Sequence, residues 1–281
     1  MLGKLIKYEW KSVYKVGCLI LGAVALTTFM GWLAFQSPMW KEMETGHSYS
    51  GAVAGWLNII SGLTLIMYVI LLACASFGTL VYLVVHFYRT MYTDEGYLIH
   101  TLPVTKHQIL VSKILVGGIW MLFVGVSLIL SAVFLCMTML TSIFGHDMAM
   151  FWKEFVPVMD ELIYMMRVDF DVELGVRFAL GCIKLLAAPF ITLTILFGAV
   201  SLGQLAGRHR VLMAIISYIG ISIAMNFVGS VIRGVFAVAL YGNIGQYMWV
   251  SMDIGFLVDL VAAGVLYFVS WNVISKKLNM V

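Results

Sequence analysis

Long uninterrupted apolar stretches, separated by short polar segments, dominate the pattern of this chain. Six of them cover residues 16–35, 57–85, 114–140, 185–206, 211–240 and 254–275. Each reaches the roughly 20 residues that a helix needs to cross the hydrocarbon core of a bilayer. The runs are too long and continuous for alternating barrel strands, and a helix satisfies its own backbone hydrogen bonds where water is absent. The pattern predicts an all-α polytopic membrane protein, with one transmembrane domain of six helices over residues 1–281.

The composition agrees with this fold class. Hydrophobic residues make up 62% of the 281 residues and charged residues only 11%, whereas a soluble domain carries about 25% charged residues. The net charge of +3 arises from cations placed around the apolar stretches. It therefore gives no indication of nucleic-acid binding.

The distribution of Lys and Arg predicts the orientation, because short cytoplasmic loops are enriched in these residues. They gather before residue 16, in segment 87–113, near residue 209 and after residue 275, whereas acidic residues dilute the few cations of the other loops. Both termini are therefore expected in the cytoplasm, and segment 141–180 is expected to be an extracellular loop. No small-residue cleavage site follows a short apolar core, so we expect no cleaved signal peptide.

No motif in the sequence indicates an enzyme. The four cysteines lie in or beside different apolar stretches without a C-x-x-C pair, and the histidines lack metal-ligand spacing such as H-E-x-x-H. Neither the G-x-S-x-G nucleophile motif nor the G-x-x-x-x-G-K-[ST] phosphate-binding motif occurs. We expect this chain to bind no metal and no cofactor, and any ATP that it uses to be hydrolysed by another chain.

Residues 1–15 have the pattern of an amphipathic helix in the cytoplasmic interface. Lysines recur there at helical spacing, at Lys4, Lys7, Lys11 and Lys15. Such lysines bind anionic head groups, and Trp10 flanks the apolar side at head-group level. Glu9 projects from the middle of the apolar side, where an unpaired carboxylate is costly. We therefore expect Glu9 to pair with a basic or hydroxyl group of segment 87–113 or of a partner; simple anchoring is the alternative role of this helix.

Segment 87–113 is longer than a plain connection requires. Thr93 stands before two acidic residues, and Thr105 precedes Gln108 at capping-box spacing, so the segment carries two helix starts. Pro103 breaks the chain between them. The pattern predicts a short helix, a turn, and a helix that begins at Thr105 and continues into the third apolar stretch, which together suggest a docking element.

In segment 141–180, apolar residues recur at helical spacing from Phe151 to Met166. Part of it is expected to be an amphipathic helix on the outer membrane surface, with Pro157 starting or bending it. Its carboxylates either contact a cationic cargo or form a solvated face.

Three polar residues inside apolar stretches are candidates for a pathway or a structural role. Arg233 and Asp259, toward the outer ends of the last two stretches, are predicted to form a structural ion pair or a gate contact. Asn226, near the middle of the fifth stretch, is the candidate for an interhelical hydrogen bond. The glycine-punctuated segment 234–252 either connects the two stretches or dips back into the outer leaflet.

The opening GKLIKYEWK, the stretch YTDEGYLIHTLPVTKHQILVSK and the six-span plan resemble the permease subunits of bacterial ATP-binding-cassette exporters of the type-2 group. The resemblance covers the whole chain in topology and is specific in these two segments. It implies an N-terminal helix along the membrane and, in segment 87–113, a coupling helix that fits a cleft on the ATPase subunit. Carried over by position, the coupling element comprises Thr93, Asp94, Glu95, Gly96, Tyr97 and Leu98, followed by Leu102, Pro103, Val104 and Thr105. The alternative is that Asp94 and Glu95 have no docking role and only favour the N-terminus of a helix.

The resemblance implies a non-catalytic permease subunit in a bacterial plasma membrane. Its partners would be two cytosolic ATPase subunits that bind ATP and Mg, a second permease subunit, identical or related, and membrane lipid. The 19 methionines and 17 phenylalanines offer an adaptable apolar lining, which suits a hydrophobic or amphipathic cargo such as an antimicrobial peptide, a drug or a lipid. The alternative is a secondary transporter or channel without ATP, which should show broken helices or charges at the midplane.

Overall fold

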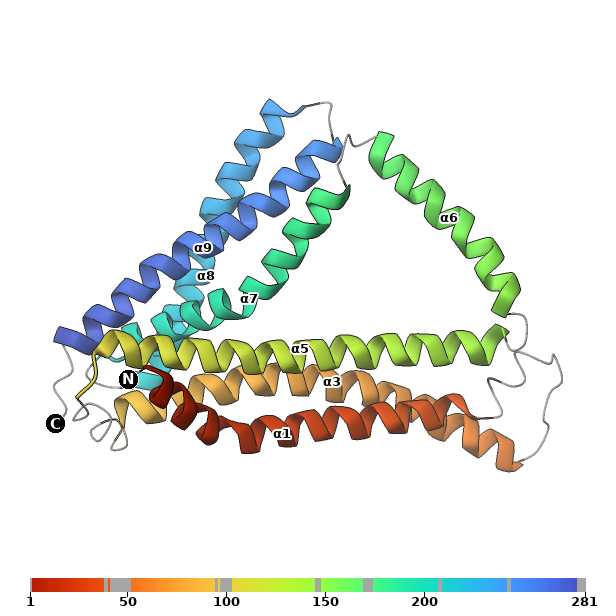
Figure 1. The fold of residues 1–281 in the computed structure, drawn as a ribbon, viewed down its shortest axis with the longest axis horizontal. Coiled ribbons are helices and arrows are strands. Elements are labelled where there is room, and N and C mark those ends of the chain that lie inside the picture. The colour runs from red at the N-terminus through yellow and green to blue at the C-terminus, as the bar shows by residue number, and fades with distance from the viewer. Residues whose placement is uncertain are drawn as a thin grey trace. The chain divides into compact units, whose positions relative to one another are not determined.

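The computed structural model describes residues 2–37, 40, 52–93, 96, 103–144, 148–168, 174–206, 209–241 and 244–276, and within these residues it contains helices and turns but no strand. The helices are α1 (Leu2–Phe35), α3 (Ala52–Tyr92), α5 (Lys106–Phe144), α6 (Met148–Val168), α7 (Leu174–Gly203), α8 (Arg210–Ala239) and α9 (Ile244–Lys276) (Figure 1). All of them except α6 are long and apolar enough to cross a membrane. The all-α class and the six candidate spans are therefore confirmed.

The helices extend well beyond the apolar stretches that predicted them. α3 has 41 residues and α5 has 39. Because a helix rises about 1.5 Å per residue, each is roughly 60 Å long, about twice the thickness of the hydrocarbon core. The polar ends of these helices therefore reach past a bilayer core, and both ends of segment 87–113 are helical.

α1 differs from the expected arrangement. Residues 2–35 form one continuous helix, and no separate interfacial helix ends at residue 15. A turn at that point would need a residue that breaks the helix, and no proline occurs within α1. Gly17, the nearest glycine, is held in close packing, because a Cβ there would lie 2.5 Å from the ring of Trp120.

The chain divides into two compact units, which we describe separately. The first unit combines residues 1–12, 80–119 and 165–281, and the second combines residues 13–79 and 120–164. In the second unit, Phe35, Trp40, Tyr68 and Leu135 form a small core. Next to it, Ser131 Oγ lies 2.7 Å from the Tyr68 hydroxyl and 2.6 Å from Thr28 Oγ1. These hydrogen bonds join α1, α3 and α5 within that unit.

The first unit contains the most deeply buried side chains. The last turns of α3, the first turns of α5 and the second half of α7 contribute Phe87, Met91, Leu110, Val116 and Leu193. α7, α8 and α9 also pack side by side (Figure 1), around Ile191, Ile195, Ala263 and Leu266. This unit carries both sites described below.

The described residues test the predictions for two segments outside the spans, 141–180 and 234–252. The helix predicted within segment 141–180 is α6, and it continues through Pro157, so the proline does not start it. α8 continues to Ala239, and α9 is one helix from Ile244 onward. Segment 234–252 therefore consists of the ends of these two helices and the turn at 240–241, apart from Gly242 and Asn243, which lie outside the described residues.

Candidate functional site

Four polar side chains in the first unit form a buried ionic group, here called the Glu9 cluster: Glu9, His86, Thr90 and Lys113. The Lys113 ammonium donates to both oxygens of the Glu9 carboxylate, with Nζ 3.0 Å from each. The same ammonium donates to Thr90 Oγ1 at 2.7 Å. His86 Nε2 lies 2.8 Å from Glu9 Oε1. The cluster therefore joins the start of α1 to the end of α3 and the start of α5.

Local helical geometry and burial explain this arrangement. His86 and Thr90 are four residues apart on α3, so they share one face of that helix. The side chain of Lys113 is only 3% exposed and that of Glu9 15% exposed. A buried ammonium is stable only when it is paired and hydrogen-bonded. Glu9 provides the opposite charge, and Thr90 provides a further acceptor.

The cluster lies outside the apolar stretches 16–35, 57–85 and 114–140, and its surroundings keep Glu9 ionised. Burial by itself raises the pKa of the Glu9 carboxyl, but the hydrogen bond from His86 and the charge of Lys113 outweigh burial and hold that pKa at about 2. Hydrogen bonds and positive charges stabilise the carboxylate form. The Glu9 carboxyl is therefore ionised at neutral pH, opposite the Lys113 amine at 3.0 Å.

The pairing predicted for Glu9 is confirmed, and its basic partner is Lys113, the last residue of segment 87–113. Sequence reasoning missed His86 and Thr90. One signal could have pointed to Lys113, because Ser112 and Lys113 are the only polar residues between the apolar runs 109–111 and 114–116. The other members of the N-terminal pattern lie as follows: Lys4, Lys7, Lys11 and Lys15 are exposed, and Trp10 is half-buried.

Aromatic contacts attach the end of α3 to α7 beside this cluster. The rings of Phe87 and Phe197 stack with centroids 3.9 Å apart and planes 7° apart. The Tyr92 hydroxyl donates to Ser201 Oγ at 2.7 Å. Because Phe87 and Ser201 are almost fully buried, the end of α3 is held by dense packing and by hydrogen bonds.

The connection between α3 and α5 is described at Thr93, Gly96, Pro103, Val104 and Thr105. The Gln108 N–H donates to Thr105 Oγ1 at 3.4 Å and α5 begins at Lys106, so the predicted helix start at Thr105 is confirmed. The Thr93 hydroxyl donates back to the Arg89 carbonyl at the end of α3. Gly96 is helical, but Asp94 and Glu95 lie outside the described residues, so the helix start at Thr93 stays a prediction.

Gly96 lies directly against the end of α3. Its N–H donates to the Thr93 carbonyl at 2.8 Å, and a Cβ at this position would lie 2.7 Å from the Met91 carbonyl oxygen. Only glycine fits so close to a backbone carbonyl. The remaining members of the proposed coupling element lie outside the described residues: Asp94, Glu95, Tyr97, Leu98 and Leu102.

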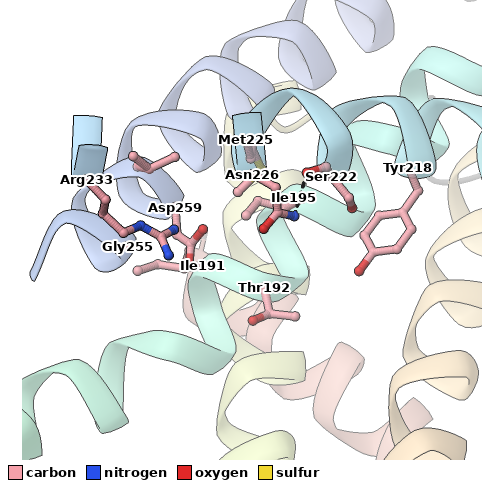
Figure 2. Close-up of a pocket in the computed structure, with 11 residues that line it drawn as sticks. Ile191, Thr192, Ile195, Tyr218, Ser222, Met225, Asn226, Arg233, Gly255 and Asp259 are labelled. Carbon is pink, nitrogen blue, oxygen red and sulfur yellow. Dashed lines mark hydrogen bonds between the residues drawn. The ribbon is translucent and has the colours of Figure 1, made fainter. Parts of the chain in front are cut away.

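A second site is a pocket of about 320 Å³ between α7, α8 and α9 (Figure 2). Its polar lining consists of Thr192, Tyr218, Ser222, Asn226, Arg233 and Asp259. The structure thus brings together the three intramembrane polar residues that the sequence singled out. Figure 2 shows the side chains of Arg233 and Asp259 pointing toward one another.

The contacts of these residues differ from those predicted. Within the described residues, no ion pair joins Arg233 to Asp259, although their charges interact. Arg233 Nε instead donates to the carbonyl of Gly229, 3.1 Å away on its own helix. Asn226 Nδ2 likewise donates to the Ser222 carbonyl at 2.8 Å, so this hydrogen bond is not interhelical. In both cases the acceptor is a backbone carbonyl four residues earlier on the same helix, which lies closer to the donor than any group on the neighbouring helices.

An ionic contact that the sequence analysis did not identify joins α7 to α9. Arg177 Nη1 donates to Asp253 Oδ2 at 2.9 Å, and Lys184 donates to the other oxygen of the same carboxylate. One carboxylate therefore holds two cations that lie two turns apart on α7. Elsewhere in the described part of the chain, no three His, Cys, Asp or Glu side chains come together as metal ligands.

Comparisons with known proteins gave no match: no protein-family model, no curated protein and no solved structure is similar to this chain.

Proposed function

We propose that this chain is the permease subunit of an ATP-driven exporter of the ABC type-2 group, in a bacterial plasma membrane with both termini in the cytoplasm. The connection between α3 and α5 would dock on a cytosolic ATPase subunit. Two such ATPase subunits, which bind ATP and Mg, and a second permease subunit, identical or related, would complete the assembly. The cargo would be hydrophobic or amphipathic, such as an antimicrobial peptide, a drug or a lipid.

The observation that carries this proposal is that both helix ends next to the α3–α5 connection are held by close contacts. On one side, the end of α3 is fixed to α7 by the Phe87–Phe197 stack. On the other side, the start of α5 is capped by Thr105 and joined to α1 through Lys113 and Glu9. A docking element with such support can transmit a displacement to the helices as a rigid-body motion.

These contacts support the following proposed mechanism. ATP binding would close the two ATPase subunits, and the displacement of the docked connection would pass to α3 and α5 together. The Glu9 cluster would couple the start of α1 to the same motion, because its hydrogen bonds are buried. The permease itself would contribute no acid, base or nucleophile, and its helices would rearrange to release the cargo outward.

The test is a detergent pull-down of the chain from its native membrane, followed by identification of the proteins that copurify. The wild type is compared with the Asp94→Ala, Glu95→Ala double variant and with an Asp160→Asn control in α6. We expect a soluble ATPase with the wild type and the control, and several-fold less with the double variant. Recovery of no ATPase from intact wild-type complexes would refute the proposal.

A secondary transporter or channel that works without ATP is the second candidate. The charged residues Arg233 and Asp259 in the pocket between membrane helices favour it, because intramembrane charges mark ion and substrate paths. The unbroken course of α7, α8 and α9 speaks against it, since such transporters commonly bind substrate at interrupted helices. Transport by the purified chain in liposomes without any ATPase would establish this second function.

A further inference from the structure

The pocket between α7, α8 and α9 has the size and lining of a binding site for a small polar group. Its volume of about 320 Å³ lies at the lower end of the range for ligand sites, which is roughly 300–1,000 Å³. Apolar side chains such as Ile191, Ile195 and Met225 line it together with the polar residues. The site therefore suits the polar end of an amphiphile, with methylene groups against the apolar side.

Both charges in the pocket have hydrogen-bonding capacity that the protein leaves unused. A guanidinium carries five N–H donors, and within the described residues the only acceptor for Arg233 is the Gly229 carbonyl. No described donor hydrogen-bonds to the Asp259 carboxylate, and no ion pair joins the two residues. Charges in a membrane segment are costly unless they are paired. A ligand that bridges them would remove this cost.

Gly229 creates the space in which the Arg233 guanidinium lies. It is buried in α8, and a Cβ at this position would lie 2.8 Å from Arg233 Nη2. The guanidinium can therefore fold back along its own helix and face the pocket beside Asp259 (Figure 2). A larger residue would push it out of this position.

Asn226 adds a further acceptor to the pocket. One N–H of its amide donates to the Ser222 carbonyl, and its oxygen accepts no hydrogen bond from the described residues, so that oxygen is free to accept one from a ligand. The pocket thus offers a cationic donor at Arg233 and two oxygen acceptors at Asp259 and Asn226. An anion alone would face the Asp259 carboxylate, and a cation alone would face the Arg233 guanidinium. A group that carries both charges avoids each repulsion.

We propose that this pocket binds the polar end of a zwitterionic amphiphile, with its anionic group on Arg233 and its primary ammonium on Asp259 and Asn226. Two sources share this chemistry: a phospholipid with an ethanolamine head group, and a small peptide with free termini. The binding is a property of this chain alone, so it goes beyond the proposed exporter function and needs no ATPase.

The experiment measures the dissociation constants of four probes for the purified full chain in a neutral detergent by isothermal titration. Dihexanoyl-phosphatidylethanolamine and the dipeptide Leu-Leu carry both charges, dihexanoyl-phosphatidylglycerol carries only the anion, and octylamine carries only the cation. We expect at least one zwitterion to bind about tenfold more tightly than either singly charged probe. Tight binding of only the lipid or only the dipeptide identifies the source. Equal affinity for all four probes, or no binding of either zwitterion, would overturn the proposal.

Variants locate the binding in this pocket. Arg233→Gln and Asp259→Asn should each weaken zwitterion binding about tenfold, whereas Arg210→Gln, at the far end of the same helix, should not. Gly229→Ala keeps both charges and should weaken binding by displacing the guanidinium. Its matched control is Gly234→Ala, where a Cβ meets nothing within 4 Å. If Gly229→Ala and Gly234→Ala bind the zwitterion equally well, the site is elsewhere.

Discussion

At the scale of single residues, Glu9 shows what a local sequence pattern can predict and what it cannot. A carboxylate on the apolar side of an amphipathic helix must find a partner, so the type of partner could be predicted. The particular partner could not, because Lys113 is 104 residues away in the chain. The depressed pKa of Glu9 means that its contribution to stability is complete above its unfolded pKa and is lost only as the pH falls toward about 2.

Lys113→Met should strongly destabilise the first unit, because it leaves the buried Glu9 carboxylate without its cation. Removing one partner of a buried ion pair costs about 3–5 kcal/mol, whereas replacing both is often close to neutral. The Glu9→Gln, Lys113→Met double variant should therefore unfold at a higher temperature than Lys113→Met alone. Melting in detergent, followed by tryptophan fluorescence, measures both.

The matched control is Lys11→Met, which removes an exposed lysine from the same helix. It should leave the melting temperature nearly unchanged, because exposed charges contribute about 0–1 kcal/mol. Equal melting temperatures for Lys113→Met and Lys11→Met would mean that the Glu9 cluster does not stabilise the fold.

Gly96→Ala should loosen the connection between α3 and α5, because the new Cβ would lie 2.7 Å from the Met91 carbonyl oxygen. We expect amide hydrogen exchange in residues 91–105 to become about tenfold faster, as local opening becomes less costly. Gly3→Ala is the control, since nothing lies within 4 Å of its Cβ position. Unchanged exchange in the Gly96 variant would show that the contact with Met91 is not needed.

At the scale of elements, the existence and type of the helices followed from the sequence, but their ends did not. Apolar periodicity marks the part of a helix that is buried in lipid. It does not mark the polar turns that continue the same hydrogen-bond ladder, as at Lys106–Lys113. The cap at Thr105 was predictable because a Thr–Gln spacing is a local signal. The continuity of α1 was missed because its lysine stripe indicated a separate surface helix.

The packing of α7 on α8 depends on Gly203, and Gly203→Ala tests this contact. A Cβ there would lie 2.5 Å from the backbone nitrogen of Ala214 and 2.6 Å from its Cα, so the two helices must separate. We expect a loss of about 1–3 kcal/mol, as for other overpacked sites, which would appear as a lower melting temperature in detergent.

Gly220→Ala is the matched control on α8, because nothing lies within 4 Å of its Cβ position. Replacing a glycine inside a helix by alanine should be neutral or stabilise by about 0.5–1 kcal/mol. A Gly203 variant as stable as the Gly220 variant would contradict the close approach of α7 and α8.

At the scale of the whole molecule, six crossings would place both termini on one side of the membrane, and the lysine distribution predicts the cytoplasmic side. Single cysteines test this in a background without Cys18, Cys74, Cys136 and Cys182. We expect a membrane-impermeant thiol reagent added to intact cells to label Lys153→Cys, in α6. It should label Lys4→Cys and Arg210→Cys only after the membrane is permeabilised.

Labelling of Lys4→Cys in intact cells would mean that the N-terminus lies outside the cell, opposite to the predicted orientation. Labelling of both Lys4→Cys and Lys153→Cys would contradict the number of crossings between them. Each variant is first denatured and labelled, so that an absent signal reports inaccessibility and not low expression.

The all-α class, the six apolar helices, the cap at Thr105 and the need of Glu9 for a partner were predictable from the amino-acid sequence. These features depend on the length and periodicity of local runs, and each run carries its own signal. The pairing of Lys113 with Glu9 became visible only in the folded chain, as did the pocket that Arg233 and Asp259 share without forming an ion pair. Such contacts depend on how helices far apart in the chain pack on one another, and no local pattern specifies that packing.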